Sequence, residues 1–122
     1  MMNDRHTESM QRMVDAILTT PGDTKTALRR AIEARAAAYG GRPGQEKASE
    51  VEVPANLTTY VDKVALHAYK TTDADIEKLL QAGYSEDAIF EITLSAALGA
   101  GRARLERGLA ALKGEKDEAE KR

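Results

Sequence analysis

Four residues that could transfer protons or bind an anion recur at helical spacing in the middle of the chain. Tyr60, Lys63, His67 and Lys70 occupy positions i, i+3, i+7 and i+10. Side chains at this spacing share one face of an α-helix. Imidazole titrates near neutral pH and a nearby cation lowers its pKa, so His67 beside Tyr60 and Lys63 is a candidate general acid or base.

The same pattern has a structural interpretation, which the sequence leaves open. In this interpretation His67 is a hydrogen-bonded residue at the edge of the core, and Tyr60 covers the core. Lys63 and Lys70 are then solvated, as lysines on helix surfaces usually are.

Several other kinds of site are excluded by residue content. The chain has no cysteine, which excludes disulfides, thiolate metal sites and thiol redox catalysis. Its two histidines, His6 and His67, are far apart and belong to no H-x-x-x-H or H-x-x-E pattern, so we expect no metal and no cofactor. The sequence also lacks a Walker loop and a G-x-S-x-G motif, which argues against phosphate cradling and serine catalysis.

The candidate residues must be positioned by a core, and the stretch 85–112 is its predicted centre. Ser85 is a good N-cap for a helix, and the acidic residues that follow suit the positive end of the helix dipole. Apolar residues point to two opposite sides, Ile89 to one and Leu94 to the other, so more than one partner helix is expected. Six small residues within 96–103 predict a close helix crossing or a kink, or else an ordinary alanine-rich core helix.

Four shorter helices are expected before this one, which makes the fold class all-α. Pro21 and Gly22 separate the first two helices. A T-x-x-D capping box from Thr72 to Asp75 opens the fourth, and Gly83 ends it. The predicted bundle of about five helices covers residues 8–18, 24–39, 54–70, 72–82 and 85–112.

The remaining segments are predicted to be loose, so the single domain covers 1–112. Residues 1–7 are polar, 40–53 form a long connection rich in Gly and charge, and 113–122 form a flexible tail of mixed charge. In the second helix the apolar side chains, such as Ile32, are expected to face inward. Its charged side chains are expected to face outward: Lys25, Arg29, Arg30, Glu33 and Arg35.

Composition favours a homo-oligomer. Of the 122 residues 42% are hydrophobic, but with one Phe, four Tyr and no Trp the core is built from small aliphatic side chains and is thin for a monomer. Leu66 lies nearly opposite the predicted core stripe of the third helix, so it is either exposed or buried by another subunit. That stripe consists of Leu57, Val61, Val64 and Ala68.

Charge and hydropathy argue against two classes of partner. The formal net charge is -2 and the pI is about 5.7, with both signs interspersed, so we expect no nucleic acid partner. Because the chain has neither a run of eighteen apolar residues nor a signal peptide core, we expect no membrane partner and a cytoplasmic location. Glu91 and Arg102, on one side of the central helix, are candidates for salt bridges at a subunit contact.

The spacing of the candidate residues matches a known motif. Within YVDKVALH, the residues Tyr60, Lys63 and His67 occupy the marked positions of C-x-x-C-x-x-x-H. The stretch HAYKTTDADIEKLLQAGYSEDAIFEITLSAALGAG continues the pattern with a short helix, a Gly turn and a small-residue helix. Over about residues 56–112 the chain thus resembles the alkylhydroperoxidase AhpD-like superfamily, also called the carboxymuconolactone decarboxylase family. The resemblance implies an all-α homo-oligomer.

The resemblance also implies altered chemistry. In members with peroxidase activity, two cysteines of this motif reduce peroxide, assisted by the His and by an acidic residue about a dozen positions upstream. Here Tyr60 and Lys63 replace both cysteines, so a thiol peroxidase cycle is chemically impossible and only His67 carries over. The acidic position falls near Ala48, and the nearest candidates, none at the matching spacing, are Glu46, Glu50 and Glu52.

The residues and the resemblance leave three hypotheses for function. The first is a pocket near His67, Tyr60 and Lys63 that binds a small organic molecule. The second is a cofactor-free acid–base enzyme of the carboxymuconolactone decarboxylase type, in which Lys63 or Lys70 pairs with a substrate carboxylate while His67 moves a proton. The third is a structural or protein-interaction oligomer that binds no ligand.

Overall fold

A computed structural model of the chain describes residues 4–39 and 52–121. Within these ranges the protein is all-helical, which confirms the predicted all-α class and the five helices. Among the described helices, none combines the length and the apolar content that crossing a bilayer requires. The elements in chain order are α1 (Asp4–Thr19), α2 (Thr26–Tyr39), α3 (Ala55–His67), the short 3-10 helix η1 (Ala68–Lys70), α4 (Asp73–Gln81) and α5 (Glu86–Lys121).

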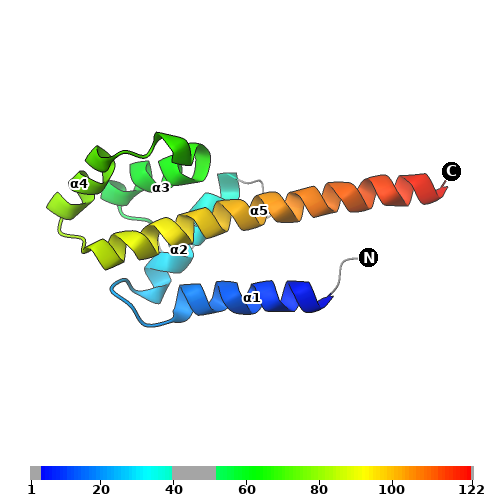
Figure 1. Ribbon diagram of the computed structural model, residues 1–122, viewed down its shortest axis with the longest axis horizontal. Helices are drawn as coiled ribbons and strands as arrows, with labels where there is room; N and C mark the ends of the chain where they lie inside the picture. The colour runs from blue at the N-terminus through cyan, green and yellow to red at the C-terminus, as the bar shows by residue number, and fades with distance from the viewer. Residues whose placement is uncertain (1–3, 40–51, 122) are drawn as a thin grey trace.

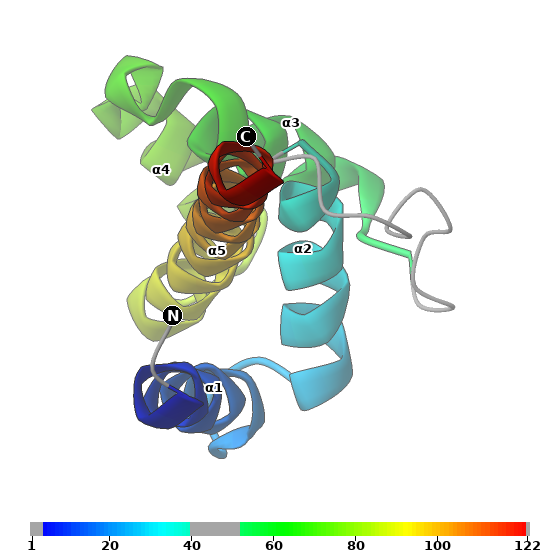
Figure 2. The ribbon, with the colours of Figure 1, turned by 90° about the vertical axis from the view of Figure 1, so that its right-hand side faces the viewer.

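The other helices pack around α5, as the sequence predicts. It runs the full length of the molecule in Figure 1, with α2 and α3 against its first half and α1 along the opposite edge. Viewed from the C-terminal end of α5 in Figure 2, α2 lies to one side, α3 above and α1 below. The buried face of α5 contributes Ile89, Ile92, Ala96 and Ala100 to the main hydrophobic cluster.

Helix ends in the second half of the chain follow local sequence chemistry. Thr72 and Asp75 form the predicted capping box at the start of α4. Gly83 has a positive φ of 102°, and the N–H groups of Gly83 and Tyr84 donate to the carbonyls of Leu80 and Leu79, which is the Schellman ending. The Ser85 hydroxyl accepts a 3.0 Å hydrogen bond from the N–H of Ala88 and so caps α5.

The third helix differs from the prediction of one continuous helix over 54–70. The α-helix stops at His67, whose backbone leaves the helical region with φ -145° and ψ 57°, and the 3-10 helix η1 follows. Ala68, predicted in the core stripe, is exposed because this break turns it outward. The last turn of α3 gains an outside donor, since Arg104 of α5 gives a 2.7 Å hydrogen bond to the carbonyl of Ala65.

The two ends of the chain are more helical than predicted. In place of the loose segment 1–7 and the flexible tail 113–122, the structure has helix over 4–7 and 113–121. The last stretch is rich in Lys and Glu, which favour helix, and it contains no Pro. The predicted connection 40–53 lies outside the described residues up to position 51.

The charged face predicted for α2 is partly buried. Arg29 is 3% exposed and Glu33 is 8% exposed, so the prediction that both face solvent is wrong. The Arg29 guanidinium donates to the carbonyls of Ile17 at 2.7 Å, Thr20 at 2.6 Å and Thr24 at 3.2 Å. The end of α1 therefore packs across this face of α2 and supplies acceptors for the buried charge.

Candidate functional site

Tyr60 is a buried residue whose hydroxyl joins α3 to α5. Its side chain is 6% exposed, and the hydroxyl oxygen lies 2.6 Å from Oγ1 of Thr93. Thr93 uses its one hydroxyl proton to donate to the carbonyl of Ile89 at 2.7 Å, so Tyr60 is the donor in the bond with Thr93. The Tyr60 proton is therefore committed to a contact between two helices.

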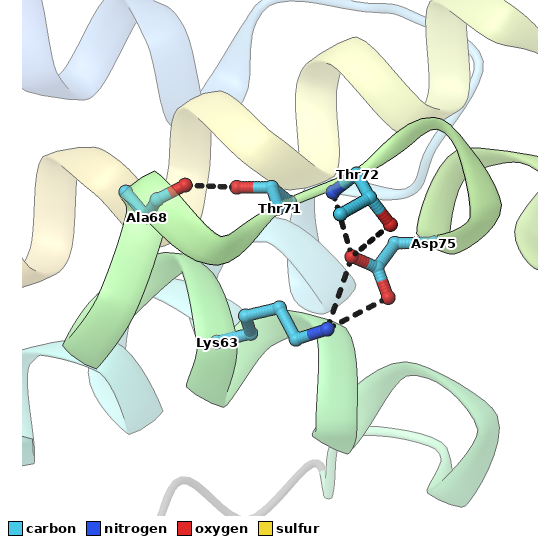
Figure 3. Close-up of polar contacts among 5 residues, drawn as sticks. All are labelled: Lys63, Ala68, Thr71, Thr72 and Asp75. Atoms are coloured by element: carbon cyan, nitrogen blue, oxygen red, sulfur yellow. Dashed lines mark hydrogen bonds and ion pairs between the residues drawn. The ribbon is translucent and has the colours of Figure 1, made fainter.

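Lys63 forms an ion pair with the first turn of α4. Its Nζ lies 2.9 Å and 3.0 Å from the two carboxylate oxygens of Asp75 (Figure 3). One of these oxygens also accepts the backbone N–H of Thr72 at 2.8 Å. The hydrogen bond from Lys63, followed by that from Thr72, lowers the pKa of Asp75 below its ordinary value. The ammonium of Lys63 thus has an anionic partner within the chain.

His67 lies at the surface, at the point where α3 ends. Its side chain is exposed and meets the ring of Tyr69 edge to face, with 5.9 Å between ring centroids and 82° between ring planes. Lys70 places its Nζ 5.8 Å from the centroid of the same ring. Tyr69 itself is 80% exposed, so these three residues form an open cluster on the surface.

The three predicted site residues have separate surroundings. Tyr60 contacts α5, Lys63 contacts α4, and His67 contacts the turn that follows its own helix. Among the described contacts, none joins two of these three side chains. The i, i+3, i+7 spacing placed them on one face, but that face runs from the core at Tyr60 to solvent at His67.

Two partners of these residues were not foreseen. Asp75 is predicted as part of the capping box, and no local sequence signal indicates that its carboxylate also pairs with Lys63. Thr93, on α5, likewise has no sequence signal that marks it as a partner of Tyr60. Both contacts depend on how α3 crosses α4 and α5, which residue spacing within one helix does not encode.

The acidic candidates for a partner of His67 add little to the site. Glu46 and Glu50 lie outside the described residues, and Glu52 is exposed. An acidic partner for His67 therefore stays a prediction. Among the side chains that the structure describes, in 8–39 and 52–114, no group of three or more His, Asp and Glu is arranged to hold a metal ion.

Glu91 binds the connection between α1 and α2. Its carboxylate accepts the N–H of Asp23 at 2.9 Å, and the N–H and hydroxyl of Thr24 at 2.8 and 2.5 Å. Burial alone would raise the pKa of Glu91, but these hydrogen bonds and the charge of Arg29 outweigh it and lower the pKa. Arg102 pairs with Glu106 of the same helix at 3.2 Å, so both residues have partners within the chain, and salt bridges at a subunit contact stay a prediction.

A further ion pair joins α2 to α3. Arg35 donates from Nε and from one terminal nitrogen to the two carboxylate oxygens of Asp62, at 2.7 and 2.8 Å. Burial and then the charge and hydrogen bonding of Asp62 raise the pKa of Tyr39 beside this pair. Like Lys63–Asp75, this pair serves to fix one helix against the next.

Comparison of the chain with known protein families, curated proteins and solved structures finds no match. The resemblance to the AhpD-like superfamily therefore stays a prediction, and function is argued from the residues and their geometry.

Proposed function

We propose that the protein is a helical, non-enzymatic protein that acts by associating with proteins, in the first place with a second copy of itself. The observation that carries this proposal is the commitment of Tyr60 and Lys63 to Thr93 and Asp75. A general acid or an anion-binding group needs an atom that is available to the substrate. Here the hydroxyl and the ammonium stabilise helix contacts instead.

Exposed apolar side chains support the association. On α5, Phe90 is 66% exposed, Leu105 44% and Leu112 63%. Leu66 on α3, predicted to be exposed or covered by a subunit, is 43% exposed. Large apolar side chains gathered on one helix commonly mark interaction surfaces. A second subunit would also enlarge a core that contains few aromatic residues.

Sedimentation velocity of the full chain at micromolar concentration tests this proposal. At protein concentrations of about 10 to 100 times the dissociation constant, we expect the mass of at least two chains. On dilution, the mass should shift toward that of a monomer. The variants Tyr60→Phe and Lys63→Met, when folded, should have the same oligomeric state as the unchanged chain. A monomer at every concentration up to the millimolar range would overturn the proposal.

A second candidate function is binding of a small organic molecule near His67, and the exposed cluster of His67, Tyr69 and Lys70 favours it. These side chains offer an imidazole, an aromatic face and a cation that are not engaged with other helices. An acid–base enzyme of the decarboxylase type would use His67 for the proton. Lys70 would then bind the substrate carboxylate, because Lys63 is paired with Asp75.

A thermal-shift screen against carboxylic acids, lactones and aromatic compounds tests this second candidate. A ligand at a hundred times its dissociation constant stabilises the protein by about 2.7 kcal/mol, which raises the melting temperature by several degrees. Stabilisation that disappears in His67→Ala and persists in His6→Ala would support a site at His67. Stabilisation that survives His67→Ala would place the ligand elsewhere.

Membership of the AhpD-like superfamily and a cytoplasmic location are also proposals. The helix, Gly turn and long helix over about 56–112 support the first, through the Thr72–Asp75 capping box and the Gly83 turn. Thiol peroxidase activity is excluded in either case, because the chain has no cysteine. An experimental structure in which α3, α4 and α5 fail to superpose on members of that family would overturn the assignment.

A further inference from the structure

The outward face of α5 carries a short repeat of Leu and Gly. Leu98, Gly101, Leu105, Gly108 and Leu112 are spaced by three, four, three and four residues. This is the spacing of the a and d positions in the seven-residue repeat of a coiled coil. Within this stretch Leu occupies each a position and Gly occupies each d position. At 100° per residue, this Leu/Gly stripe lies opposite the buried face that includes Ile92, Ala96 and Ala103.

Packing within the chain partly buries Leu98 but leaves the rest of this stripe open. Leu105 and Leu112 are 44% and 63% exposed. A Cβ atom added at Gly101 or Gly108 would have no neighbour within 4 Å. Glycine is among the poorest helix formers, so its use at two open positions of a helix needs another reason. This part of α5 also extends past α2, α3 and α4, as Figure 1 shows.

We infer that the Leu/Gly stripe is the surface through which two copies of the chain associate, with their α5 helices antiparallel. Leu105 and Leu112 of one copy then pack against glycines of the other. In this register, Leu105 faces Gly108 of the second copy and Leu112 faces Gly101 of the second copy. The inference rests on the proposed self-association and assigns its surface.

The alternation of large and small residues favours the antiparallel arrangement. Antiparallel coiled coils pair a positions with d positions, so the four central layers of this pair each join a Leu to a Gly. A parallel pair would stack Leu on Leu and Gly on Gly, which leaves voids beside the glycines. Interdigitation of large with small side chains gives the closer packing.

Charges beside the stripe select the register. In the register given above, Arg102 lies beside Leu109 of the second copy and Arg104 beside Ala111 of the second copy. A shift by one heptad toward the N-terminus would place Arg102 against Arg102 and Arg104 against Arg104, which is unfavourable. Both arginines already have partners in their own chain, Glu106 and the Ala65 carbonyl.

The area of contact is sufficient for a weak dimer. The two α5 helices overlap over roughly 30 residues, or about 45 Å at 1.5 Å per residue. A contact over about a third of the circumference of each helix buries on the order of 1,000 Å² in total, which is the lower limit for a specific interface. We therefore expect dissociation in the micromolar range.

The variant Gly108→Glu tests the stripe, and Gly114→Glu is its matched control. Both glycines lie on α5 with no neighbour within 4 Å of an added Cβ, and both changes add one negative charge, but position 114 lies off the stripe. Sedimentation equilibrium should show a dissociation constant about a hundredfold higher for Gly108→Glu, because its carboxylate would face Leu105 of the second copy. Gly114→Glu should match the unchanged chain.

The possible outcomes separate this inference from the proposed function. A dimer that is equally stable in both variants would overturn the Leu/Gly stripe as the surface and leave self-association standing. An unchanged chain that is monomeric would overturn both. Circular dichroism of each variant at the same concentration should show intact helix, so that loss of the dimer is separated from loss of the fold.

Spin labels test the antiparallel arrangement, and the absence of cysteine allows single-site labelling. Arg107→Cys and Gly114→Cys occupy the same heptad position, one heptad apart. In the antiparallel dimer, the two labels at 107 lie almost level along the helix axis, whereas those at 114 are about 22 Å apart along it. Electron paramagnetic resonance should therefore give a longer distance at 114. Equal distances at both positions would indicate a parallel pair and overturn the inferred arrangement.

Discussion

Gly99 of α5 lies directly against the backbone of Glu33 on α2. A Cβ atom at position 99 would overlap the carbonyl oxygen of Glu33, so the two helices approach more closely than any larger residue allows. The contact between α2 and α5 is the most extensive between two elements of the described chain. Gly99 therefore sets the distance between the central helix and its main partner.

Replacement of this glycine is expected to destabilise the fold. Alanine favours helix over glycine by about 1 kcal/mol, but the added methyl group would meet backbone, which cannot move aside as a side chain can. We expect Gly99→Ala to lower the free energy of unfolding by about 1–3 kcal/mol, measured by urea denaturation. Gly114→Ala, with open space around its Cβ, should cause no loss, and equal stability of the two variants would contradict the close crossing.

The hydroxyl of Tyr60 is expected to act in stability. Tyr60→Phe removes the hydrogen bond to Thr93 and should lower the free energy of unfolding by about 1 kcal/mol. Tyr69→Phe removes a hydroxyl from a ring that is 80% exposed and should leave stability unchanged. Urea denaturation of both variants at pH 7 makes the comparison. An unchanged stability for Tyr60→Phe would mean that its hydroxyl is available for another role.

Much of the fold was predictable because its signals are local. The capping box at Thr72 and Asp75, the turn at Gly83 and the cap at Ser85 each depend on residues within one turn of helix. The small residues around Gly99 indicated a close crossing, although the sequence could not say which of them makes it. Gly99 meets α2, whereas Gly101, two residues later, has open space.

The surroundings of the charged residues were not predictable from one helix at a time. Arg29 looked solvent-facing because α2 carries charges on that side, but the end of α1 covers it and its carbonyls accept the guanidinium protons. Lys63 likewise looked free until α4 placed Asp75 beside it. His67 does not continue the helix face of Tyr60 and Lys63, because α3 ends at His67. In each case the deciding contact comes from another element of the fold.

The pair of Lys63 and Asp75 predicts a dependence of stability on pH. The pKa of Asp75 is lowered in the folded protein, first by Lys63 and then by the N–H of Thr72. Its contribution to stability is therefore present above the unfolded pKa of about 3.9, and is lost as the pH falls through the lower folded value. Lys63→Met should move the pKa of Asp75 back toward its ordinary value, which an NMR titration of the carboxyl carbon measures.

A second lysine of the same region provides the control for this titration. Lys78 lies on α4 and is exposed, so Lys78→Met removes the same charge without removing the contact with Asp75. The pKa of Asp75 should then stay low. Equal shifts in the two variants would mean that general charge, and not the ion pair, determines the pKa.

Glu91 predicts a second acid-sensitive contact, between α5 and the connection that precedes α2. Burial raises its pKa, but the hydrogen bonds from Thr24 and Asp23 lower it by more, so the ionised form is favoured in the folded protein. The resulting stability is present above the unfolded pKa of about 4.3 and is lost as the pH falls through the lower folded pKa. Glu91→Gln should cost about 2 kcal/mol at neutral pH, because its amide cannot accept all three hydrogen bonds as a carboxylate does.

This cost should disappear in acid, since the protonated carboxyl of the unchanged chain then resembles the amide of the variant. Urea denaturation at pH 7 and at about pH 2.5 measures the difference between the two chains at each pH, and Glu77→Gln on the exposed side of α4 is the control. A difference that stays constant between these pH values would show that the shape of the Glu91 side chain, and not its charge, binds the connection between α1 and α2.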